Sequence, residues 1–296
     1  MRLDRLLTLA VTHPVSRLRR TDPSGKGELG RLPILMYHSI SDDPEEGISP
    51  YYRVCTSPAR FSQQMACLSR NGYRGVSLSD GLAELQGEAD GAPRSSGSPV
   101  AIVFDDGFQD FASAAVPVLQ AHRFQATVNL PTAYIADTPR QFKHRPCLTW
   151  SEVLDLHQIG IEFGAHTVTH PRLVTLPWGA VETEIADSKR EIERRLPTRV
   201  RTFAYPYDYP QTDLTFRSRL RSLLQDLGFE SAVTTIVGTA GLRDNRLELP
   251  RLPVNDRDDD ALLLAKLQGA YDWFAGPQYW YKRLRKLAGA PARPRS

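Results

Sequence analysis

Two adjacent carboxylates at the end of an apolar segment are the first sign of chemistry in this sequence. Residues 100–104 are all apolar, without polar alternation, which is typical of a strand buried on both faces of a parallel sheet. Asp105, Asp106 and Gly107 follow directly. Neighbouring carboxylates repel each other and are costly to remove from water unless a cation compensates their charge. The pair fits a metal site, although a solvated Asp-Asp-Gly turn explains it better when it is considered alone.

Two histidines, His166 and His170, follow another short strand candidate at residues 161–165. Histidines four residues apart can meet on one helical face or in a tight loop. Pro171 disfavours helical geometry at His170, so we expect a loop or a single turn. Two histidines with one carboxylate form a facial donor set that leaves positions open for water and substrate. This set suits zinc, iron, cobalt or nickel, and the sequence does not choose among them.

An aromatic segment, Tyr205-Pro206-Tyr207, follows a third strand candidate that begins at Val200. A proline-stiffened aromatic segment could form a wall for a sugar-sized ligand. A plain exit from a strand into a loop explains this segment better when it is considered alone. A fourth apolar strand, residues 33–38, ends in His38.

Alternating strand and helix patterns are expected to position these side chains. About eight strand-like segments alternate with helical ones from residue 33 onward, which predicts parallel βαβ units. This number favours a barrel over an open sheet, and no glycine-rich phosphate loop follows the first strand. Catalytic groups in such barrels lie at the carboxyl ends of strands. His38, the Asp105-Asp106 pair and His166 all occupy such ends.

Composition excludes several function classes. The 296 residues are 41% hydrophobic and 24% charged, as in ordinary globular proteins, and the formal charge of +3 does not indicate a nucleic-acid ligand. Cys55, Cys67 and Cys147 are isolated, which argues against a disulfide framework or a zinc-thiolate site and favours a reducing compartment. The apolar patch at residues 6–11 is shorter than a usual signal core. We therefore expect a cytoplasmic protein, with membrane association as an option.

Charge and linker composition suggest three parts: a basic N-terminal appendage and linker (1–31), a catalytic barrel (32–270) and a basic C-terminal tail (271–296). Solvated tails are the simpler interpretation of the basic ends. Weak attraction to anionic lipid or to an acidic glycan is the alternative.

Taken together and in order, the three motifs resemble motifs one to three of the polysaccharide deacetylases, the NodB-homology domain of carbohydrate esterase family 4. The resemblance covers roughly residues 33–255. It implies a distorted (β/α)7 barrel of the α/β class and a divalent metal ion, with zinc ranked before cobalt, nickel or iron. By position, Asp105 would be the general base. The implied metal ligands are Asp106, His166 and His170, and the implied substrate-binding residues are Tyr205, Pro206 and Tyr207, with the Tyr207 backbone N–H holding the oxyanion.

The chain departs from the commonest pattern of that family in three places. Ala204 replaces the usual arginine of motif three, no Asp-Trp pair occurs in residues 231–237, and residues 249–254 contain no histidine. The opening Tyr37-His38 is similar to the circularly permuted branch, which includes poly-N-acetylglucosamine deacetylases and takes its acid histidine from the first strand. The resemblance therefore assigns the acid role to His38. We further infer that Arg251 replaces the missing arginine beside Asp105.

These features predict metal-dependent hydrolysis of an N-acetyl group on a hexosamine within a saccharide or its precursor. A cytoplasmic location would favour a nucleotide- or lipid-linked precursor over finished polymer. The first alternative is an amidohydrolase that acts on a small cyclic amide or formamide. The second is a non-catalytic glycan-binding module, against which the complete Asp, Asp, His, His set argues.

Overall fold

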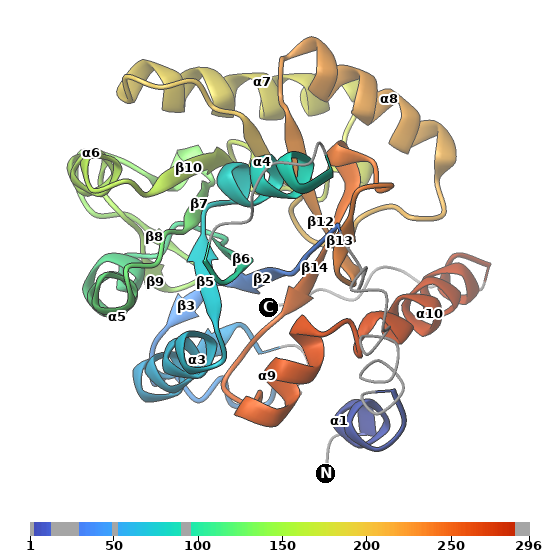
Figure 1. Cartoon of the computed structure of the whole chain (residues 1–296). Coiled ribbons are helices and arrows are strands. Elements are labelled where there is room, and N and C mark those ends of the chain that lie inside the picture. The colour runs from blue at the N-terminus through green and yellow to red at the C-terminus, as the bar shows by residue number, and fades with distance from the viewer. Residues whose placement is uncertain (1–2, 13–29, 49–52, 90–95, 288–296) are drawn as a thin grey trace.

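Seven parallel strands close into a barrel in the computed structural model, which describes residues 3–12, 30–48, 53–89 and 96–287 (Figure 1). The strand order around the ring is β2, β14, β12, β11, β10, β7 and β6. Pairing of β2 with β6 closes it. The strands of the ring are β2 (Ile34–Tyr37), β6 (Ser98–Phe104), β7 (Thr127–Leu130), β10 (Glu162–Ala165), β11 (Thr202–Ala204), β12 (Ser231–Val237) and β14 (Leu249–Pro253).

An eighth strand, β5 (Tyr73–Val76), pairs with the first half of β6 and remains outside the closed ring. The predicted distorted (β/α)7 barrel is thus confirmed. Short strands form small additional sheets around the barrel: β1 (Arg31–Leu32) with β13 (Ala240–Gly241), β3 (Ser39–Ile40) with β4 (Cys55–Thr56), and β8 (Gln141–Phe142) with β9 (Arg145–Pro146).

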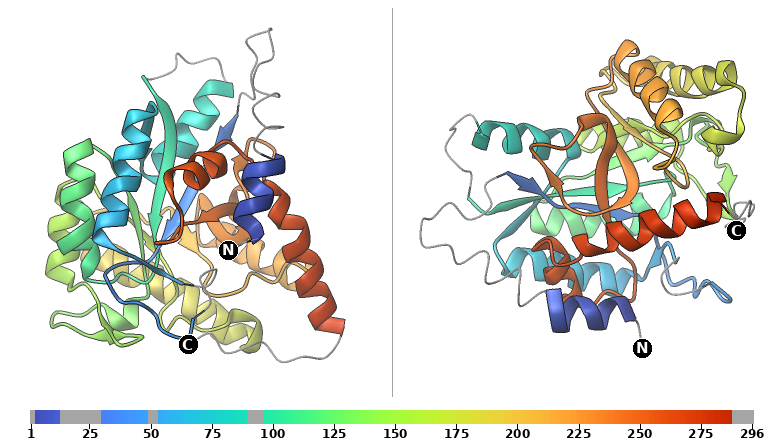
Figure 2. Two further views of the ribbon diagram at one scale, coloured as in Figure 1. Left: turned by 90° about the horizontal axis from the view of Figure 1, so that it is seen from below. Right: turned by 90° about the vertical axis from the view of Figure 1, so that its right-hand side faces the viewer.

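Helices surround the barrel, with α7 and α8 on one side and α3, α9 and α10 on the other (Figures 1 and 2). The α-helices are α1 (Leu3–Leu7), α3 (Pro58–Arg70), α4 (Leu78–Ala89), α5 (Val116–His122), α6 (Trp150–Gln158), α7 (Trp178–Arg195), α8 (Leu214–Asp226), α9 (Asp260–Leu267) and α10 (Ala275–Leu287). Single turns of 3-10 or π geometry are η1 (Thr8–Thr12), η2 (Phe111–Ala115), η3 (Thr132–Tyr134), η4 (Leu173–Thr175), η5 (Arg246–Glu248) and η6 (Asp272–Phe274).

Local sequence signals account for several helix ends. Thr149 and Glu152 form a capping box at the start of α6: each side chain accepts a hydrogen bond from the other residue's backbone N–H. Ser57 caps α3, and Pro58 occupies its first turn, where a missing N–H costs nothing. These caps fix where the helices begin and so fix the lengths of the strand-to-helix loops.

Alternation along β6 divides the core into two layers. Ala101 and Val103 face the barrel interior, where they pack with residues from β2, β11, β12 and α4. Ile102 and Phe104 face outward and join the larger cluster between the strands and the helices. Both faces are therefore buried, which explains why residues 100–104 lack polar alternation.

The described parts of the two basic ends contact each other. The Tyr271 hydroxyl donates to the Asp4 carboxylate over 2.7 Å, and the Trp273 indole N–H donates to the Thr8 hydroxyl over 3.2 Å. Residues 13–29 and 288–296, which include much of the predicted linker and tail, lie outside the described residues.

Candidate active site and metal centre

A cavity of about 540 Å³ opens at the carboxyl ends of the barrel strands. Residues from the loop after β3 and from the β8–β9 hairpin form part of its rim. Among the site residues predicted from the sequence, those that line it are His38, Asp105, His166, His170, Tyr205, Tyr207 and Arg251. Asp106 is 1% exposed and contacts the two histidines, whereas Pro206 is buried and does not line the cavity.

The two-residue periodicity of the strands explains which side chains reach this cavity. Ala101 and Val103 of β6 point into the barrel, so Asp105, the first residue after the strand, points to the same side. On β14, Leu249 points inward, and so does Arg251 two residues later. On β2, Ile34 points inward, and His38, four residues later, lies on the same side.

Within residues 3–12, 30–48, 53–89 and 96–287, one group of three or more His, Cys, Asp or Glu side chains could hold a metal ion: Asp106, His166 and His170. One donor atom from each lies within 4.8 Å of the others. Asp106 Oδ1 is 3.2 Å from His170 Nε2 and 3.6 Å from His166 Nε2. Among the described residues, Asp106 Oδ1 is a buried oxygen without a hydrogen-bond partner, and it faces the Nε2 atoms of both histidines. A metal would satisfy such an oxygen together with the two imidazoles, so the residues fit a divalent ion.

The hydrogen bonding and the pKa values of these residues both favour metal binding. His166 Nδ1 lies 2.8 Å from the Ala204 carbonyl oxygen, which orients the ring with Nε2 toward Asp106. Burial lowers the pKa of His170 to about 4, so the ring is neutral and can ligate at physiological pH. Burial raises the pKa of Asp106, but Lys143 and the two histidines outweigh it and hold that pKa well below the usual value.

The loop that carries the two histidines has unusual backbone geometry. Thr167 has φ of 67° and His170 has φ of 56°, in the left-handed region that residues with side chains seldom occupy. Glu184 on α7 stabilises the loop: its carboxylate accepts from the backbone N–H groups of Val168 and Thr169, each over 2.8 Å. The expectation of a loop or single turn at His170 is confirmed, and strain of this kind is common where side chains must be aimed at a site.

Asp105 has different partners from Asp106, although the two are adjacent. Arg251 Nη1 lies 2.9 Å from Oδ1 and 2.8 Å from Oδ2 of Asp105, and Arg251 Nε donates to the Thr234 carbonyl over 2.8 Å. The Asn129 side-chain amide donates to Asp105 Oδ1 over 2.8 Å. Burial favours protonation of Asp105, but the nearby cations, Arg251 foremost, hold its pKa below the usual value. Asp105 is therefore a buried, ionised carboxylate outside the metal group.

Three further predicted residues border the cavity. His38 follows β2 and is partly buried; burial lowers the pKa of its ring, which the carboxylates of Asp106 and Asp105 partly oppose. Tyr207 has φ of 55°, and its ring centroid lies 4.6 Å from that of His170. Tyr205 is only 2% exposed, and its hydroxyl donates to the Leu247 carbonyl. The aromatic face beside the histidines is therefore that of Tyr207.

The sequence interpretation did not single out Lys143. It lies in the two-residue turn of the β8–β9 hairpin, where Lys143 and His144 have φ of 50° and 62°. Its ammonium is 3.1 Å from Asp106 Oδ2. A two-residue turn with two positive φ values usually contains Asn or Gly. Lys143 and His144 depart from that pattern, but the departure can be recognised only once the hairpin is known.

Asn129 was missed as well. It lies inside β7, a strand whose residues are all buried. A Cβ at Gly164 on the neighbouring strand would lie 2.3 Å from Asn129 Oδ1, so that glycine leaves the space which the amide needs. The signal available in the sequence was a carboxamide between two apolar strand residues, Val128 and Leu130.

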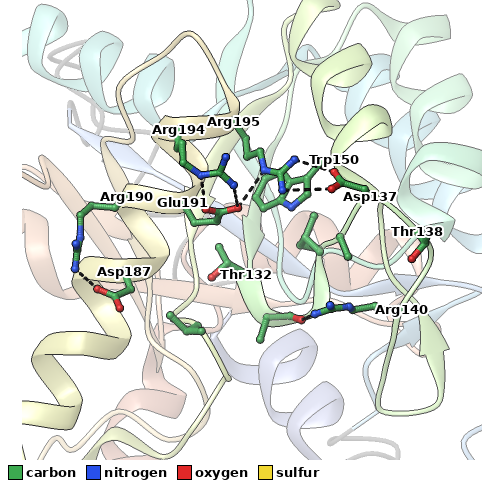
Figure 3. Close-up of a pocket in the computed structure, with 14 residues that line it drawn as sticks. Thr132, Asp137, Thr138, Arg140, Trp150, Asp187, Arg190, Glu191, Arg194 and Arg195 are labelled. Atoms are coloured by element: carbon green, nitrogen blue, oxygen red, sulfur yellow. Dashed lines mark hydrogen bonds and ion pairs between the residues drawn. The ribbon is translucent and has the colours of Figure 1, made fainter.

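A second depression of about 630 Å³ lies between α7 and the loop after β7 (Figure 3). Arginines dominate its rim, but carboxylates neutralise most of them. Arg190 pairs with Asp187, and Arg194 pairs with Glu191. Arg195 pairs with both Glu191 and Asp137. None of the predicted site residues lines it.

Comparison with known proteins agrees with this geometry. The sequence model of the family described as polysaccharide deacetylase matches residues 92–232. YxkH of Bacillus subtilis, whose name assigns it to the polysaccharide deacetylases, is 28% identical over 225 residues, which cover 76% of this chain and 72% of that protein. The poly-beta-1,6-N-acetyl-D-glucosamine N-deacetylase of Escherichia coli is 29% identical over 143 residues, 45% of this chain but 20% of that enzyme.

A solved structure extends the similarity to the whole barrel. The Streptococcus pyogenes deacetylase PplD in complex with acetate has a TM-score of 0.66 and 26% identity, covering 80% of this chain and 98% of that one. The motifs, the barrel and these relatives agree: residues 92–232 match the polysaccharide deacetylase family model, and the barrel as a whole is similar to a solved deacetylase.

Proposed function

We propose that this protein is a metal-dependent hydrolase that removes the N-acetyl group from a hexosamine within a saccharide or its precursor. One observation carries the proposal. The buried carboxylate of Asp105, which Arg251 keeps ionised, lies next to that of Asp106, which clusters with two histidines. This group lies at the base of a cavity large enough for a sugar residue. Adjacent acids with separate partners allow separate roles, one in proton transfer and one in metal binding.

Asp106, His166 and His170 would hold the metal. When bound there, a divalent ion would lower the pKa of water and polarise the amide carbonyl. His166 is already oriented through its Nδ1 contact with the Ala204 carbonyl, so its Nε2 atom is the one available for ligation. Asn129 and Arg251 hold Asp105 apart from this group.

Asp105 would accept the proton of the attacking water. Arg251 and the Asn129 amide keep its carboxylate ionised and fix its orientation, because both donate to Oδ1. The backbone N–H of Tyr207 would donate to the carbonyl oxygen as negative charge develops on it. The positive φ at Tyr207 sets the direction of that peptide unit.

His38 would protonate the departing amine. It follows Tyr37, which pairs in register with Phe104, the residue before Asp105, so the two catalytic groups leave neighbouring strands. Because burial lowers the pKa of His38, the protonated fraction falls at a lower pH than for an ordinary histidine. Activity should accordingly decline toward alkaline pH.

A substrate panel tests the proposal. Metal-free protein is reconstituted with zinc, cobalt or nickel and offered N-acetylglucosamine oligomers, nucleotide- and lipid-linked N-acetylhexosamines, and small cyclic amides. We expect acetate and a free amine from an N-acetylhexosamine substrate only after reconstitution. His166→Ala should lose both metal and activity, whereas His157→Ala, a change of the same type on α6 outside the cavity, should keep both. Metal-independent turnover, or cleavage of the cyclic amides alone, would refute the proposed activity.

A further inference from the structure

Helix α10 has an inner face that forms part of the cavity wall. The Gln278 side-chain amide donates to the Thr235 carbonyl over 2.8 Å and accepts from the Val237 N–H over 3.1 Å. One turn further along the helix, Lys282 Nζ donates to the Tyr209 carbonyl over 3.4 Å. Residues four apart share one side of a helix, so this side of α10 is fixed to the barrel. Gln278 also lines the active-site cavity.

The outer face of α10 is apolar and exposed. Trp280 and Leu284 each lie two residues beyond an inner-face residue, which turns them about 200° around the helix axis. Trp280 is 56% exposed, Leu284 is 62% exposed and Tyr281 beside them is 52% exposed. In both panels of Figure 2, α10, drawn in red, lies at the outer surface of the molecule.

The sequence of α10 and of the residues after it carries positive charge only, although Lys282 belongs to the inner face and lies 3.8 Å from Asp208 Oδ1. From residue 273 to the end of the printed sequence there is no Asp or Glu, and the basic residues are Lys282, Arg283, Arg285, Lys286, Arg293 and Arg295. Arg283 is exposed, and its guanidinium lies 5.1 Å from the centroid of the Trp280 ring. Tryptophan and leucine on one face, beside an exposed arginine and within a basic segment, are typical of helices that lie in the surface of an anionic bilayer.

We propose that α10 binds the surface of an anionic lipid bilayer, with Trp280 and Leu284 inserted among the lipid headgroups. None of the described helices is long and apolar enough to cross a membrane, so the contact would be peripheral. A second copy of the chain fits this face less well, because a symmetric contact would bring the two basic segments together. Gln278 on the inner face of α10 forms part of the active-site cavity wall. Binding through the outer face of the same helix would therefore hold that wall at the membrane surface.

Vesicle sedimentation with the purified full chain tests this proposal. Phosphatidylcholine vesicles are compared with vesicles that also contain phosphatidylglycerol, at low and high salt. The W280S/L284S double variant removes the inserted side chains, and R283E reverses one charge. L214S is the matched control, because Leu214 on α8 is also exposed, at 72%. Thermal unfolding of each variant checks that the barrel is intact.

We expect binding to the phosphatidylglycerol vesicles only, and its loss at high salt. W280S/L284S should lower the partition coefficient by about tenfold or more, and R283E should lower it by about fivefold or more. L214S should bind as the unmodified protein does. Absence of binding, equal binding to neutral vesicles, or an equal loss in L214S would overturn the proposal. So would a dimer, detected by light scattering, that W280S/L284S dissociates. Vesicle binding needs no turnover, so this test is independent of the proposed activity.

Discussion

Replacing Arg251 with methionine should leave Asp105, the proposed general base, without its counter-charge. Arg251 is 1% exposed and Asp105 is 3% exposed, and one guanidinium nitrogen lies within 2.9 Å of both carboxylate oxygens. Methionine fills part of the same space without a charge or a donor. The carboxylate of Asp105 would then be buried with the Asn129 amide as its remaining described side-chain donor.

The magnitude follows from the burial of this pair. Breaking a buried ion pair by removing one partner costs about 3–5 kcal/mol of folding free energy. If all of that were electrostatic, the pKa of Asp105 would rise by at most about 2–4 units. The native pKa of Asp105 is depressed, so the pair contributes stability above the unfolded pKa of an aspartate and loses it as the pH falls. The deficit of Arg251→Met should therefore be largest near neutral pH and should shrink as acid protonates the unpaired carboxylate.

Two measurements check this expectation. Denaturant unfolding of the metal-free protein at pH 7 and pH 5 gives the stability deficit, and the pH dependence of kcat/KM gives the apparent pKa of the base. The acidic limb of that profile should move to higher pH in Arg251→Met. Adding Asp105→Asn to Arg251→Met removes the stranded charge and should restore part of the stability, but not the activity.

Lys266→Met is the matched control. Lys266 and Asp258 form another buried ion pair, each 1% exposed and 2.9 Å apart, and neither lines the active-site cavity. This variant should lose a comparable amount of stability without any shift of the acidic limb. If Arg251→Met leaves the limb unchanged, or if Lys266→Met shifts it equally, Arg251 does not set the pKa of the catalytic base.

Three other predictions concern the same cavity. Asp105→Asn should keep the metal and lose turnover, whereas Asp106→Asn should weaken metal binding itself; elemental analysis beside activity measurements separates the two, and near-normal turnover in Asp105→Asn would contradict its role. His38→Ala should lower kcat by about 10²–10⁴-fold with unchanged metal content, and should flatten the basic limb of the pH profile. Equal damage on amide and activated-ester substrates would show that His38 only supports the structure. Lys143→Met should tighten metal binding in a chelator competition, because it removes a cation 3.1 Å from Oδ2 of Asp106, a proposed metal ligand; weaker binding would mean that Lys143 supports the site instead.

Much of the fold could be predicted because its signals are local. The apolar segment 100–104 indicated a doubly buried strand, and β6 is one. The capping box at Thr149 and Glu152 fixed the start of α6. About eight strand segments were expected, and eight strands form the main sheet, but the sequence did not indicate that β5 would remain outside the ring. That distinction depends on which strands pair, which is a long-range property.

The same limit explains the residues that were missed. Asn129 contacts Asp105 across 24 positions of sequence, and Lys143 contacts Asp106 across 37. Neither belongs to a motif with fixed spacing. Asn129 matters because β7 is next to β6 in the ring, and Lys143 matters because a hairpin turn aims it at the cavity. Both conditions follow from the packing of strands and loops, which periodicity within one segment does not report.

Ring closure also explains how this chain can do without the arginine that motif three of the family usually carries. Ala204 occupies that position on β11, and the guanidinium beside Asp105 comes instead from Arg251 on β14. The strand β14 pairs with β2, and β2 pairs with β6, so His38, Asp105 and Arg251 leave three consecutive strands of the ring. A closed barrel has no edge strand, and its inner face accepts a side chain from any strand whose alternation points inward. The Asp105 carboxylate therefore requires a guanidinium at a particular position beside it, but it does not require that group to come from a particular strand.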